Sequence, residues 1–289
     1  MDNGSGNDDA DRIEDRFGGR IELIRAPRNL GYGGGANLGI LWALGQHVDY
    51  VWILNNDTVI TVDAIGRLVA AMETDRGLGA SSPLIDAPIG PESPEGIWYS
   101  GGTVNLARAE THHLRTSPGP TPGVIPTGYI TGCAMFLRSE ALQASGLFWE
   151  SLFLYWEDVD LSLRLRRAGW GLGVVPSATI SHLVHGSVRP DVAERFYSRN
   201  AILVARRHES TRVVVRAVMS LLTRLVRHWA SALLRRRSMP IAETRGLAEG
   251  AAAAFWWTAR RGINLGTDRK SSSAGPFTGE GAPSPREAR

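Results

Sequence analysis

Short apolar runs alternate along the chain with longer segments in which apolar residues recur at helical spacing. The runs that predict strands lie at 20–25, 49–54, 97–104 and 171–183, and a strand followed by a helix is predicted within 128–146. Helical spacing predicts helices at 36–46, 61–74, 157–169 and 191–208. This order predicts an α/β fold in which a mostly parallel sheet is flanked by helices.

Two segments interrupt this alternation. A glycine-rich loop at 31–35 is expected between the strand at 20–25, which Pro27 ends, and the helix from Ala36. Between residues 85 and 127 the sequence is rich in Pro and Gly, with one strand or hairpin near 97–104. Long excursions of this kind are often functional.

The segment 211–237 predicts an amphipathic basic helix, with seven Arg and no Asp or Glu. Its apolar face is formed by Val214, Val218, Leu221, Leu222, Leu225, Trp229 and Leu233. Residues 265–289 carry almost no large apolar side chain, which predicts disorder. The chain is therefore divided into a catalytic domain at 1–208, a basic helical region at 209–264 and a disordered tail at 265–289.

Composition narrows the class of protein. With 43% hydrophobic and 21% charged residues the chain is typical of a globular protein, and it contains no apolar run long enough for a bilayer span. The acidic start lacks the features of a signal peptide, so a cytoplasmic location is expected. The single Cys133 excludes an internal disulfide, and the absence of a nucleic-acid-binding motif argues against a nucleic-acid partner.

Asn55, Asn56 and Asp57 follow the predicted strand at 49–54 directly. Open α/β sheets bind ligands at this carboxyl edge, and a carboxylate there is suited to Mg²⁺ or Mn²⁺ that also contacts substrate phosphates. His182, at the end of the last predicted strand, is a candidate second metal ligand. The alternative for Asn55, Asn56 and Asp57 is a polar turn that caps the next helix. The alternative for His182 is a packed or surface residue that binds no metal.

Three carboxylates, Glu157, Asp158 and Asp160, begin a predicted helix after the aromatic segment 146–156. A sugar hydroxyl must lose its proton to a positioned base as it attacks, and Asp158 is the predicted base, with Glu157 beside it. The alternative is that these acids only complement the helix dipole.

The glycine loop also permits a dehydrogenase hypothesis, because residues 31–36 satisfy G-x-G-x-x-A. Against it, Pro27, Arg28 and Asn29 separate the predicted strand from the first glycine. The dinucleotide motif needs that glycine at the turn that leaves the strand.

Six motifs in order resemble the family 2 glycosyltransferases, and rhamnosyltransferase-like members in particular. They lie at 2–5 (DNGS), 28–39 (RNLGYGGGANLG), 53–58 (ILNNDT), 131–142 (TGCAMFLRSEAL), 153–170 (FLYWEDVDLSLRLRRAGW) and 196–207 (FYSRNAILVARR). The resemblance implies a GT-A fold, a nucleotide-diphosphate sugar as donor, a divalent metal ion and inversion at the anomeric carbon.

Carried over to this sequence, the resemblance assigns the site residues by role. Nucleotide-sugar contacts fall on Asp2, Asn29, Gly31, Gly34, Asn37, Asn55, Asn56 and Asp57. Asp57 and His182 are the expected metal ligands, and Asp158 with Glu157 the catalytic pair. Gly132, Cys133 and Trp156 are expected to contact the acceptor.

Family members have a strand, a helix and a second strand before the DNGS motif, which here begins at Asp2. The resemblance therefore predicts a sheet that lacks its first strand. The leading hypothesis is a glycosyltransferase of cell-envelope polysaccharide synthesis, with rhamnose as a candidate sugar and a glycan or lipid-linked acceptor. The enzyme would lie at the inner face of the plasma membrane, which the basic helix would contact. The alternative is an inactive homologue that serves as a binding subunit.

Overall fold

The computed structural model describes residues 1–263, except 7, 92, 120–122, 184–188 and 236–238. Its contacts divide the chain into Met1–Ala254 and Phe255–Arg289. The first unit carries the fold and the site described below. The tail predicted to be disordered, 265–289, lies outside the described residues, and the proposed division at residue 208 stays a prediction.

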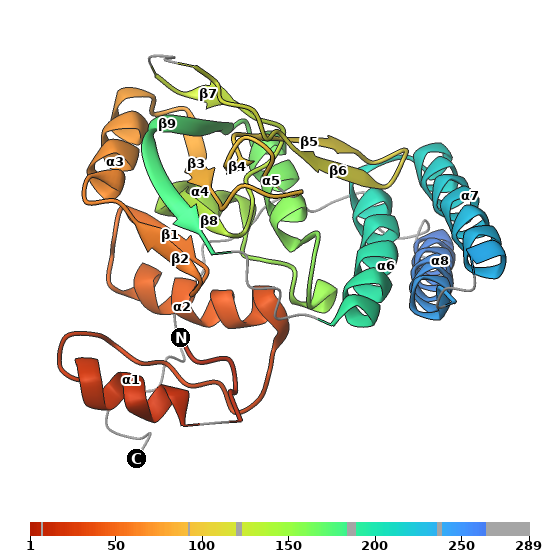
Figure 1. The fold of residues 1–289 in the computed structure, drawn as a ribbon, viewed down its shortest axis with the longest axis horizontal. Coiled ribbons are helices and arrows are strands. Elements are labelled where there is room, and N and C mark those ends of the chain that lie inside the picture. The colour runs from red at the N-terminus through yellow and green to blue at the C-terminus, as the bar shows by residue number, and fades with distance from the viewer. Residues whose placement is uncertain (7, 92, 120–122, 184–188, 236–238, 264–289) are drawn as a thin grey trace. The chain divides into compact units, whose positions relative to one another are not determined.

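A seven-stranded sheet forms the centre of the first unit (Figure 1). Its main strands follow the order β1-β8-β3-β9-β2, with β4 paired to β3 and β7 paired to β9. The strands are β1 (Tyr50–Leu54), β2 (Thr58–Ile60), β3 (Leu78–Asp86), β4 (Ile97–Tyr99), β7 (Ile125–Pro126), β8 (Ala134–Arg138) and β9 (Gly171–His182). The strands expected at 49–54 and 171–183 and the one expected within 128–146 are thus present.

The sheet is mixed, and its strand directions bring several strand ends to one edge. β8 is antiparallel to both β1 and β3, while β9 is parallel to β3, so β1, β3 and β9 run the same way. β3 ends at this edge, and the chain returns to it after the excursion at 87–133 to begin β8. β8 must therefore run back against its neighbours, which limits parallel pairing to β3 with β9.

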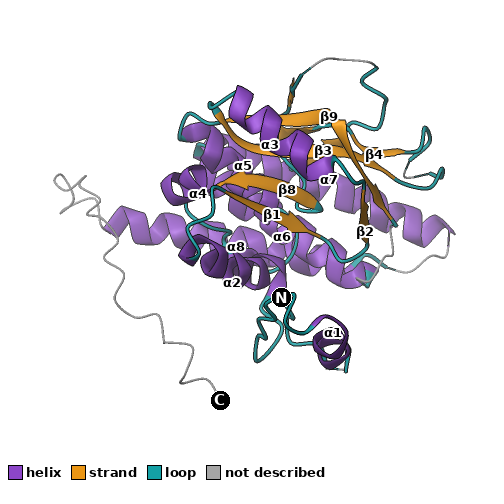
Figure 2. Cartoon of the chain, turned by 90° about the vertical axis from the view of Figure 1, so that its left-hand side faces the viewer, coloured by secondary structure: helices purple, strands orange, loops and turns teal. Residues whose placement is uncertain are grey.

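Helices cover both faces of the sheet (Figure 2). Helix α3 (Ala64–Thr74) packs on one face through Leu68 and Met72, which contact Phe136 and Val175. Helices α2 (Gly31–Gly45), α4 (Ser139–Ser145) and α5 (Glu157–Arg167) cover the other. Strand β8 contributes alternate residues to the two faces, as a doubly covered strand does.

Strand β1 lies at one end of the strand order β1-β8-β3-β9-β2 and, among the described strands, pairs with β8 alone. Strand β1 is therefore an edge strand among the described residues. The strand expected at 20–25 does not form. Arg25 makes one isolated bridge to Asp2 after helix α1 (Asp9–Phe17), because residues 20–25 lie beside no strand that could continue a ladder.

The glycine-rich segment at 31–35 is not a loop before a helix, as the sequence suggested, but the first turns of α2. Gly31 has φ +76°, and a Cβ added there would lie 2.3 Å from the carbonyl oxygen of Phe153. Only glycine accommodates this backbone at this distance. The glycines therefore let α2 pack closely against the segment that leads into α5.

Three helices follow the sheet: α6 (Pro190–His208), α7 (Thr211–Arg235) and α8 (Ile241–Ile263). The predicted basic helix is present as α7, and its buried face of Val214, Leu221 and Leu225 packs in one cluster with α6. Leu233 of the predicted apolar face is 65% exposed. None of the described helices is long and apolar enough to span a bilayer.

A separate hairpin of β5 (Gly102–Asn105) and β6 (Glu110–His113) lies in the long excursion. Tyr197 of α6 contacts it, with its hydroxyl 3.2 Å from the Thr111 hydroxyl. Arg224 of α7 donates to the carbonyl oxygens of Arg108 and Ala109 and pairs with Glu110. Contacts with α6 and α7 therefore fix the position of the hairpin.

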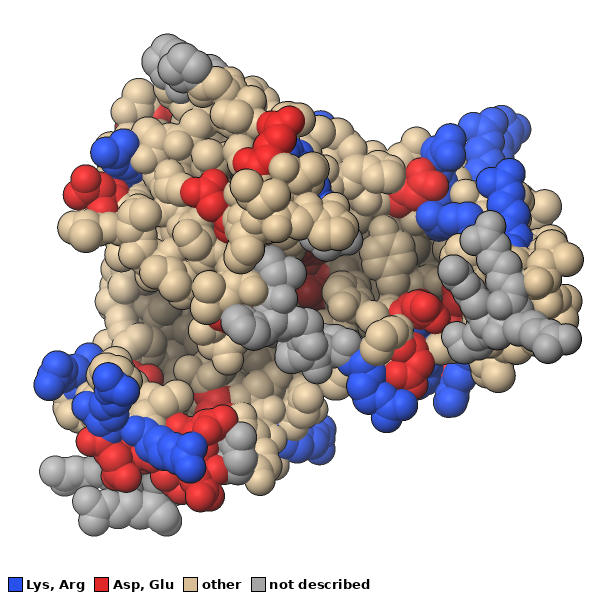
Figure 3. All heavy atoms as spheres, viewed as in Figure 1, with Lys and Arg blue, Asp and Glu red and all other residues tan. Residues whose placement is uncertain are grey.

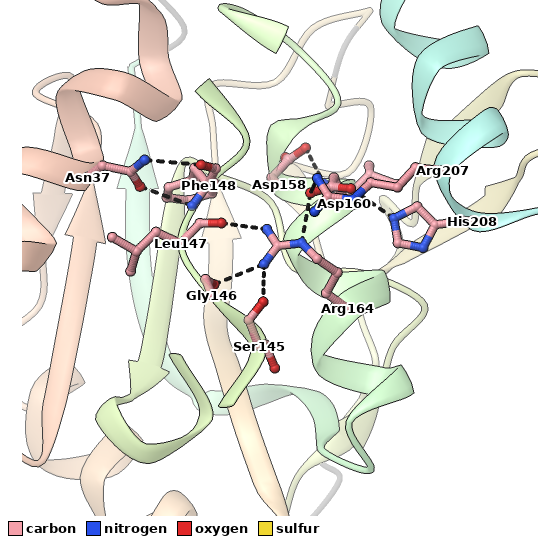
Figure 4. Close-up of polar contacts among 11 residues, drawn as sticks. Asn37, Ser145, Gly146, Leu147, Phe148, Asp158, Asp160, Arg164, Arg207 and His208 are labelled. Atoms are coloured by element: carbon pink, nitrogen blue, oxygen red, sulfur yellow. Dashed lines mark hydrogen bonds and ion pairs between the residues drawn. The ribbon is translucent and has the colours of Figure 1, made fainter. Parts of the chain in front are cut away.

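A buried ionic network joins α5 to α6 (Figure 4). Asp160 is fully buried, and its carboxylate accepts from Arg164 (2.9 Å), Arg207 (3.3 Å) and His208 (2.8 Å). Arg164 also donates to the carbonyl oxygens of residues 145–147, which ties the end of α4 to α5. Burial opposes ionisation of Asp160, but these donors outweigh it and lower its pKa.

We expect Asp160→Ala to lower the free energy of unfolding by about 3–5 kcal/mol, because it leaves buried cationic groups without their carboxylate. Urea unfolding followed by circular dichroism measures this loss. The matched control is Asp191→Ala, whose carboxylate pairs with Arg189 on the surface and should contribute at most about 1 kcal/mol. Equal losses from the two substitutions would show that the network does not join these helices.

Candidate active site

A cavity of about 880 Å³ lies at the edge of the sheet where β1 and β9 end and β8 begins. Figure 3 shows acidic atoms in a recess near the middle of this face. Most of the site residues predicted from the sequence line the cavity: Asn29, Gly31, Asn55, Asn56, Asp57, Gly132, Cys133, Trp156, Glu157, Asp158 and His182. Segments far apart in the sequence therefore converge where open α/β sheets bind their ligands.

Asp57 and His182 meet at one end of the cavity. The pairing of β2 with β9 places them together, and His182 Nε2 lies 3.2 Å from Asp57 Oδ2. Asp57 Oδ1 and His182 Nδ1 are buried without a hydrogen-bond partner among the described residues. Buried polar atoms of this kind point to a ligand or ion that completes the site.

The donor set of Asp57 and His182 suits a divalent cation in part. A carboxylate and an imidazole are both common ligands, and the side chains of Asn55 and Asn56 line the cavity beside them. No group of three or more His, Cys, Asp or Glu suited to a metal occurs within the described part of the chain. An ion at Asp57 therefore fits this site if substrate oxygens complete its coordination, as Mg²⁺ commonly requires.

Asp158 lines the same cavity and lies at the start of α5. Its Oδ2 accepts a hydrogen bond from the backbone N–H of Gly132 (2.9 Å), and its Oδ1 accepts one from Val159 (2.7 Å). Burial raises the pKa of Asp158, and these two donors act in the opposite direction. The backbone thus fixes the orientation of a carboxylate that faces the cavity.

Glu157 is more deeply buried than its neighbour, at 6% exposure. Burial and then the negative charge of Asp158 raise the pKa of Glu157 to about 8. The charge of Asp158 therefore favours the protonated form of Glu157.

The turn before α5 carries three non-glycine residues with positive φ: Phe153 (66°), Tyr155 (66°) and Trp156 (72°). Such conformations cost of order 1–3 kcal/mol each and persist where surrounding contacts impose them. Here the side-chain amide of Asn200, on α6, donates to the carbonyl oxygens of Leu152, Leu154 and Tyr155. Asn200 therefore holds the turn that directs aromatic side chains into the cavity.

Asn3 is a lining residue that the sequence analysis did not single out. Its Oδ1 accepts from the N–H of Leu30 (3.0 Å) and its Nδ2 donates to the carbonyl of Gly31 (2.9 Å). Asn29 Oδ1 accepts from the N–H of Gly31 (2.8 Å). The only available signal was the position of Asn3 inside the DNGS motif. These bonds fix the start of α2 at the cavity wall.

Three predicted nucleotide-sugar contacts do not line the cavity. Hydrogen bonds from the side chain of Ser5 and from its N–H (3.0 Å) to the carboxylate lower the pKa of Asp2. Gly34 packs against Leu30. Asn37 is buried and exchanges hydrogen bonds with the backbone of Phe148, so its amide connects α2 to the segment before α5.

The predicted acceptor contacts, Gly132, Cys133 and Trp156, line the cavity together with Asp158. The carbonyl oxygen of Gly132 accepts from the hydroxyl of Tyr32, and the N–H of Gly132 holds Asp158. Burial, followed by the charge of Asp57, raises the pKa of Cys133 to about 12. The thiol therefore stays protonated at neutral pH, which excludes Cys133 as a thiolate nucleophile.

A second wall of the cavity was missed by the sequence analysis. It is formed by Trp98, Thr111, His113, Arg115, Tyr129 and Tyr197. Only the Pro- and Gly-rich composition of the excursion marked this region as a functional candidate. The alternation of residues 111–115 was too short to be recognised as one face of a strand.

Comparison with known proteins agrees with this geometry. A family model described as "Glycosyl transferase family 2" matches residues 1–141. The chain is 28% identical over 255 residues to the N-acetylglucosaminyl-diphospho-decaprenol L-rhamnosyltransferase of Mycobacterium tuberculosis, covering 78% of this chain and 81% of that protein. It is 27% identical over 158 residues to the galactofuranosyltransferase GlfT1 of Mycolicibacterium smegmatis, covering 54% and 51%.

Among solved structures, the crystal structure of GalNAc-T7 with UDP, GalNAc and Mn²⁺ superposes with a TM-score of 0.52 at 18% sequence identity. The match covers 68% of this chain and 38% of that chain, so this chain spans well under half of that protein. At this identity the likeness shows the GT-A fold. The matches in sequence support a family 2 glycosyltransferase that is similar to rhamnosyltransferase members.

Proposed function

We propose that this protein transfers a sugar, with inversion of the anomeric carbon, from a nucleotide-diphosphate sugar to an acceptor hydroxyl. The observation that carries the proposal is that the Asp57–His182 pair and the oriented carboxylate of Asp158 line a single cavity. The pair suits the diphosphate that leaves, and the carboxylate suits the hydroxyl that attacks. A direct displacement needs both groups in the same cavity.

At the donor end, Asp57 and His182 would hold Mg²⁺ or Mn²⁺ against the donor diphosphate. The ion, when bound, supplies Lewis-acid stabilisation of the charge that develops on the departing diphosphate. The uncompensated Asp57 Oδ1 and the neighbouring Asn55 and Asn56 support this assignment. Asn29 and Asn3 would bind the remainder of the donor from the start of α2.

At the acceptor end, the carboxylate of Asp158 would take the proton of the attacking hydroxyl. The N–H groups of Gly132 and Val159 orient it, and Glu157, whose pKa is raised by burial and by the charge of Asp158, lies beside it. Buried surroundings strengthen the basicity of Asp158, because desolvation disfavours its ionised form. A base with a raised pKa accepts a proton more readily in the transition state.

A hypothesis for the two substrates comes from one relative, the N-acetylglucosaminyl-diphospho-decaprenol L-rhamnosyltransferase. By likeness to it, the donor sugar would be rhamnose and the acceptor a sugar linked through diphosphate to a lipid. Both curated relatives named above are glycosyltransferases. The product would then belong to a cell-envelope glycan.

A lipid-linked acceptor places the reaction at the inner surface of a membrane, and α7 offers a surface for it. Its predicted apolar face is largely packed inside the protein, but a second stripe of Val215, Met219 and Val226 is 55–65% exposed. Exposed arginines, among them Arg216 and Arg227, flank this stripe, and Figure 3 shows basic side chains over α7. Exposed apolar residues beside arginines suit an anionic lipid surface.

We expect the protein to float with vesicles that contain anionic lipid and to float poorly with neutral vesicles. The substitution Val215→Ser with Met219→Ser and Val226→Ser should reduce flotation by about tenfold or more, since three apolar side chains leave the interface. Val62→Ser, at a fully exposed apolar residue outside α7, is the control. Unchanged flotation of the triple variant would contradict the assignment to α7.

We expect Asp158→Asn to lower kcat for transfer by about 10²–10⁴-fold, because the positioned base is lost. The nucleotide-sugar KM should change little, since the donor end is untouched. Asp191→Asn, at an exposed carboxylate, should retain the parental rate. Transfer assays with purified variants measure both constants, and a kcat within about threefold of the parent would exclude Asp158 as the base.

The same base predicts a pH dependence. Burial raises the pKa of Asp158, so the active carboxylate accumulates only as pH rises through this raised value. The kcat/KM of the parent should therefore increase with pH on the acid side, with a midpoint above the ordinary Asp value of about 3.9. A flat profile from pH 4 to pH 7 would contradict the role of Asp158.

A further inference from the structure

Strand β6 and the residues that follow it present one polar side to the cavity. Thr111, His113 and Arg115 line the cavity and are half-buried, while His112 and Leu114 between them are 64% and 47% exposed. The ladder extends past β6, because the N–H of Leu114 donates to the carbonyl of Gly101 (2.8 Å). Successive side chains of extended backbone point to opposite sides, so these three lie in a row.

Aromatic rings connect this row to both catalytic ends of the cavity. The ring of Trp98 lies 4.5 Å from that of His182 and 4.5 Å from that of His113, in edge-to-face contact with each. The ring centroids of His113 and Tyr129 are 6.0 Å apart. Tyr129 lines the same cavity as Asp158 and precedes by three residues Gly132, whose N–H holds the Asp158 carboxylate. The row therefore adjoins the space that an acceptor must occupy to reach Asp158.

The row is held rigidly. Tyr197 contacts Thr111 through its hydroxyl, and Arg224 binds the turn of the hairpin from α7. These helices contribute to the same hydrophobic cluster as Trp156 and Tyr129. A row of side chains fixed at several points is suited to recognition, because little entropy is lost when a ligand binds.

The charges of the cavity are unevenly distributed. Among the described residues that line it, Arg115 is the one Lys or Arg, whereas Asp57, Glu157 and Asp158 are carboxylic acids. The donor diphosphate is assigned above to the end with Asp57 and His182. A second anionic group in this cavity would find its cationic partner at Arg115, and the arginine fork matches phosphate oxygens.

We propose that Thr111, His113 and Arg115 form an acceptor subsite that binds a phosphate or diphosphate attached to the acceptor sugar. Arg115 pairs with the phosphate oxygens, the Thr111 hydroxyl and the His113 ring adjoin the sugar, and Trp98 forms the surface on which the sugar packs. This inference rests on the proposed transferase function. It names Arg115 as the residue that distinguishes a phosphate-bearing acceptor from a neutral glycoside.

The test measures binding by calorimetry with three probes: methyl N-acetylglucosaminide, N-acetylglucosamine 1-phosphate and a short-chain prenyl diphospho-N-acetylglucosamine. The parent should bind both phosphate-bearing probes about tenfold or more tightly than the neutral one. Arg115→Gln should abolish that preference, and His112→Ala, on the opposite side of the row, should retain it. Tighter binding of the prenyl probe would identify a lipid-linked acceptor, and equal binding a free sugar phosphate.

A preference for phosphate that persists in Arg115→Gln, or its absence in the parent, would overturn the subsite. Thermal melting of each variant checks that it is folded. Transfer assays separate this result from the proposed function. Arg115-dependent binding without transfer from any nucleotide sugar would refute the function and leave the subsite standing. Transfer with equal acceptor KM in the parent and Arg115→Gln would refute the subsite alone.

Discussion

The side-chain amide of Asn200 donates to three backbone carbonyl groups, at 2.8, 2.7 and 2.8 Å, in the turn before α5. The turn contains three non-glycine residues with positive φ, a backbone conformation that the isolated chain would rarely adopt. Asn200 is itself fully buried on α6, so the turn is fixed by the packing of that helix. The direction in which α5 begins, and with it the position of Asp158, depends on this contact.

The rest of the site follows from that constraint and from the sheet. Because β1 and β9 end at one edge, Asp57 and His182 meet there although 125 positions separate them. Because β8 begins at the same edge, the N–H of Gly132 reaches Asp158. On the far side of α5, Asp160 joins the Arg164 network instead of the cavity. Neighbouring acids on one helix thus line the cavity and join the packed interior separately.

The sequence identified those parts of the site that depend on local pattern. Strand ends are visible as apolar runs that stop at polar residues, which located Asp57 and His182, and a helix that begins with acids located Asp158. The sequence did not predict that residues 31–35 are helical. Glycine is required at Gly31 because of its contact with Phe153, which is distant in sequence. Asn37 was assigned to the donor, whereas its amide binds the backbone of Phe148, a long-range contact that no local pattern reveals.

The second wall of the cavity was not predicted from the sequence for a related reason. The row on β6 becomes a wall only when the hairpin is fixed against α6 and α7, and these contacts join residues about 86 to 116 positions apart. The prediction of a strand at 20–25 was wrong for the opposite reason, because a long-range partner is missing. Its alternation is real, but an alternating segment forms a strand only beside a partner, and Arg25 meets Asp2 alone.

The central claim is that Asp57 and His182 bind a metal ion together with a nucleoside diphosphate. Thermal melting of the protein with UDP, dTDP or GDP, with and without Mn²⁺, tests it most directly. One nucleotide with Mn²⁺, at about a hundred times its dissociation constant, should add roughly 2.7 kcal/mol of stability, and Asp57→Asn should lose this gain. A folded protein that no nucleotide stabilises with Mn²⁺, or an equal gain in Asp57→Asn, would contradict the account.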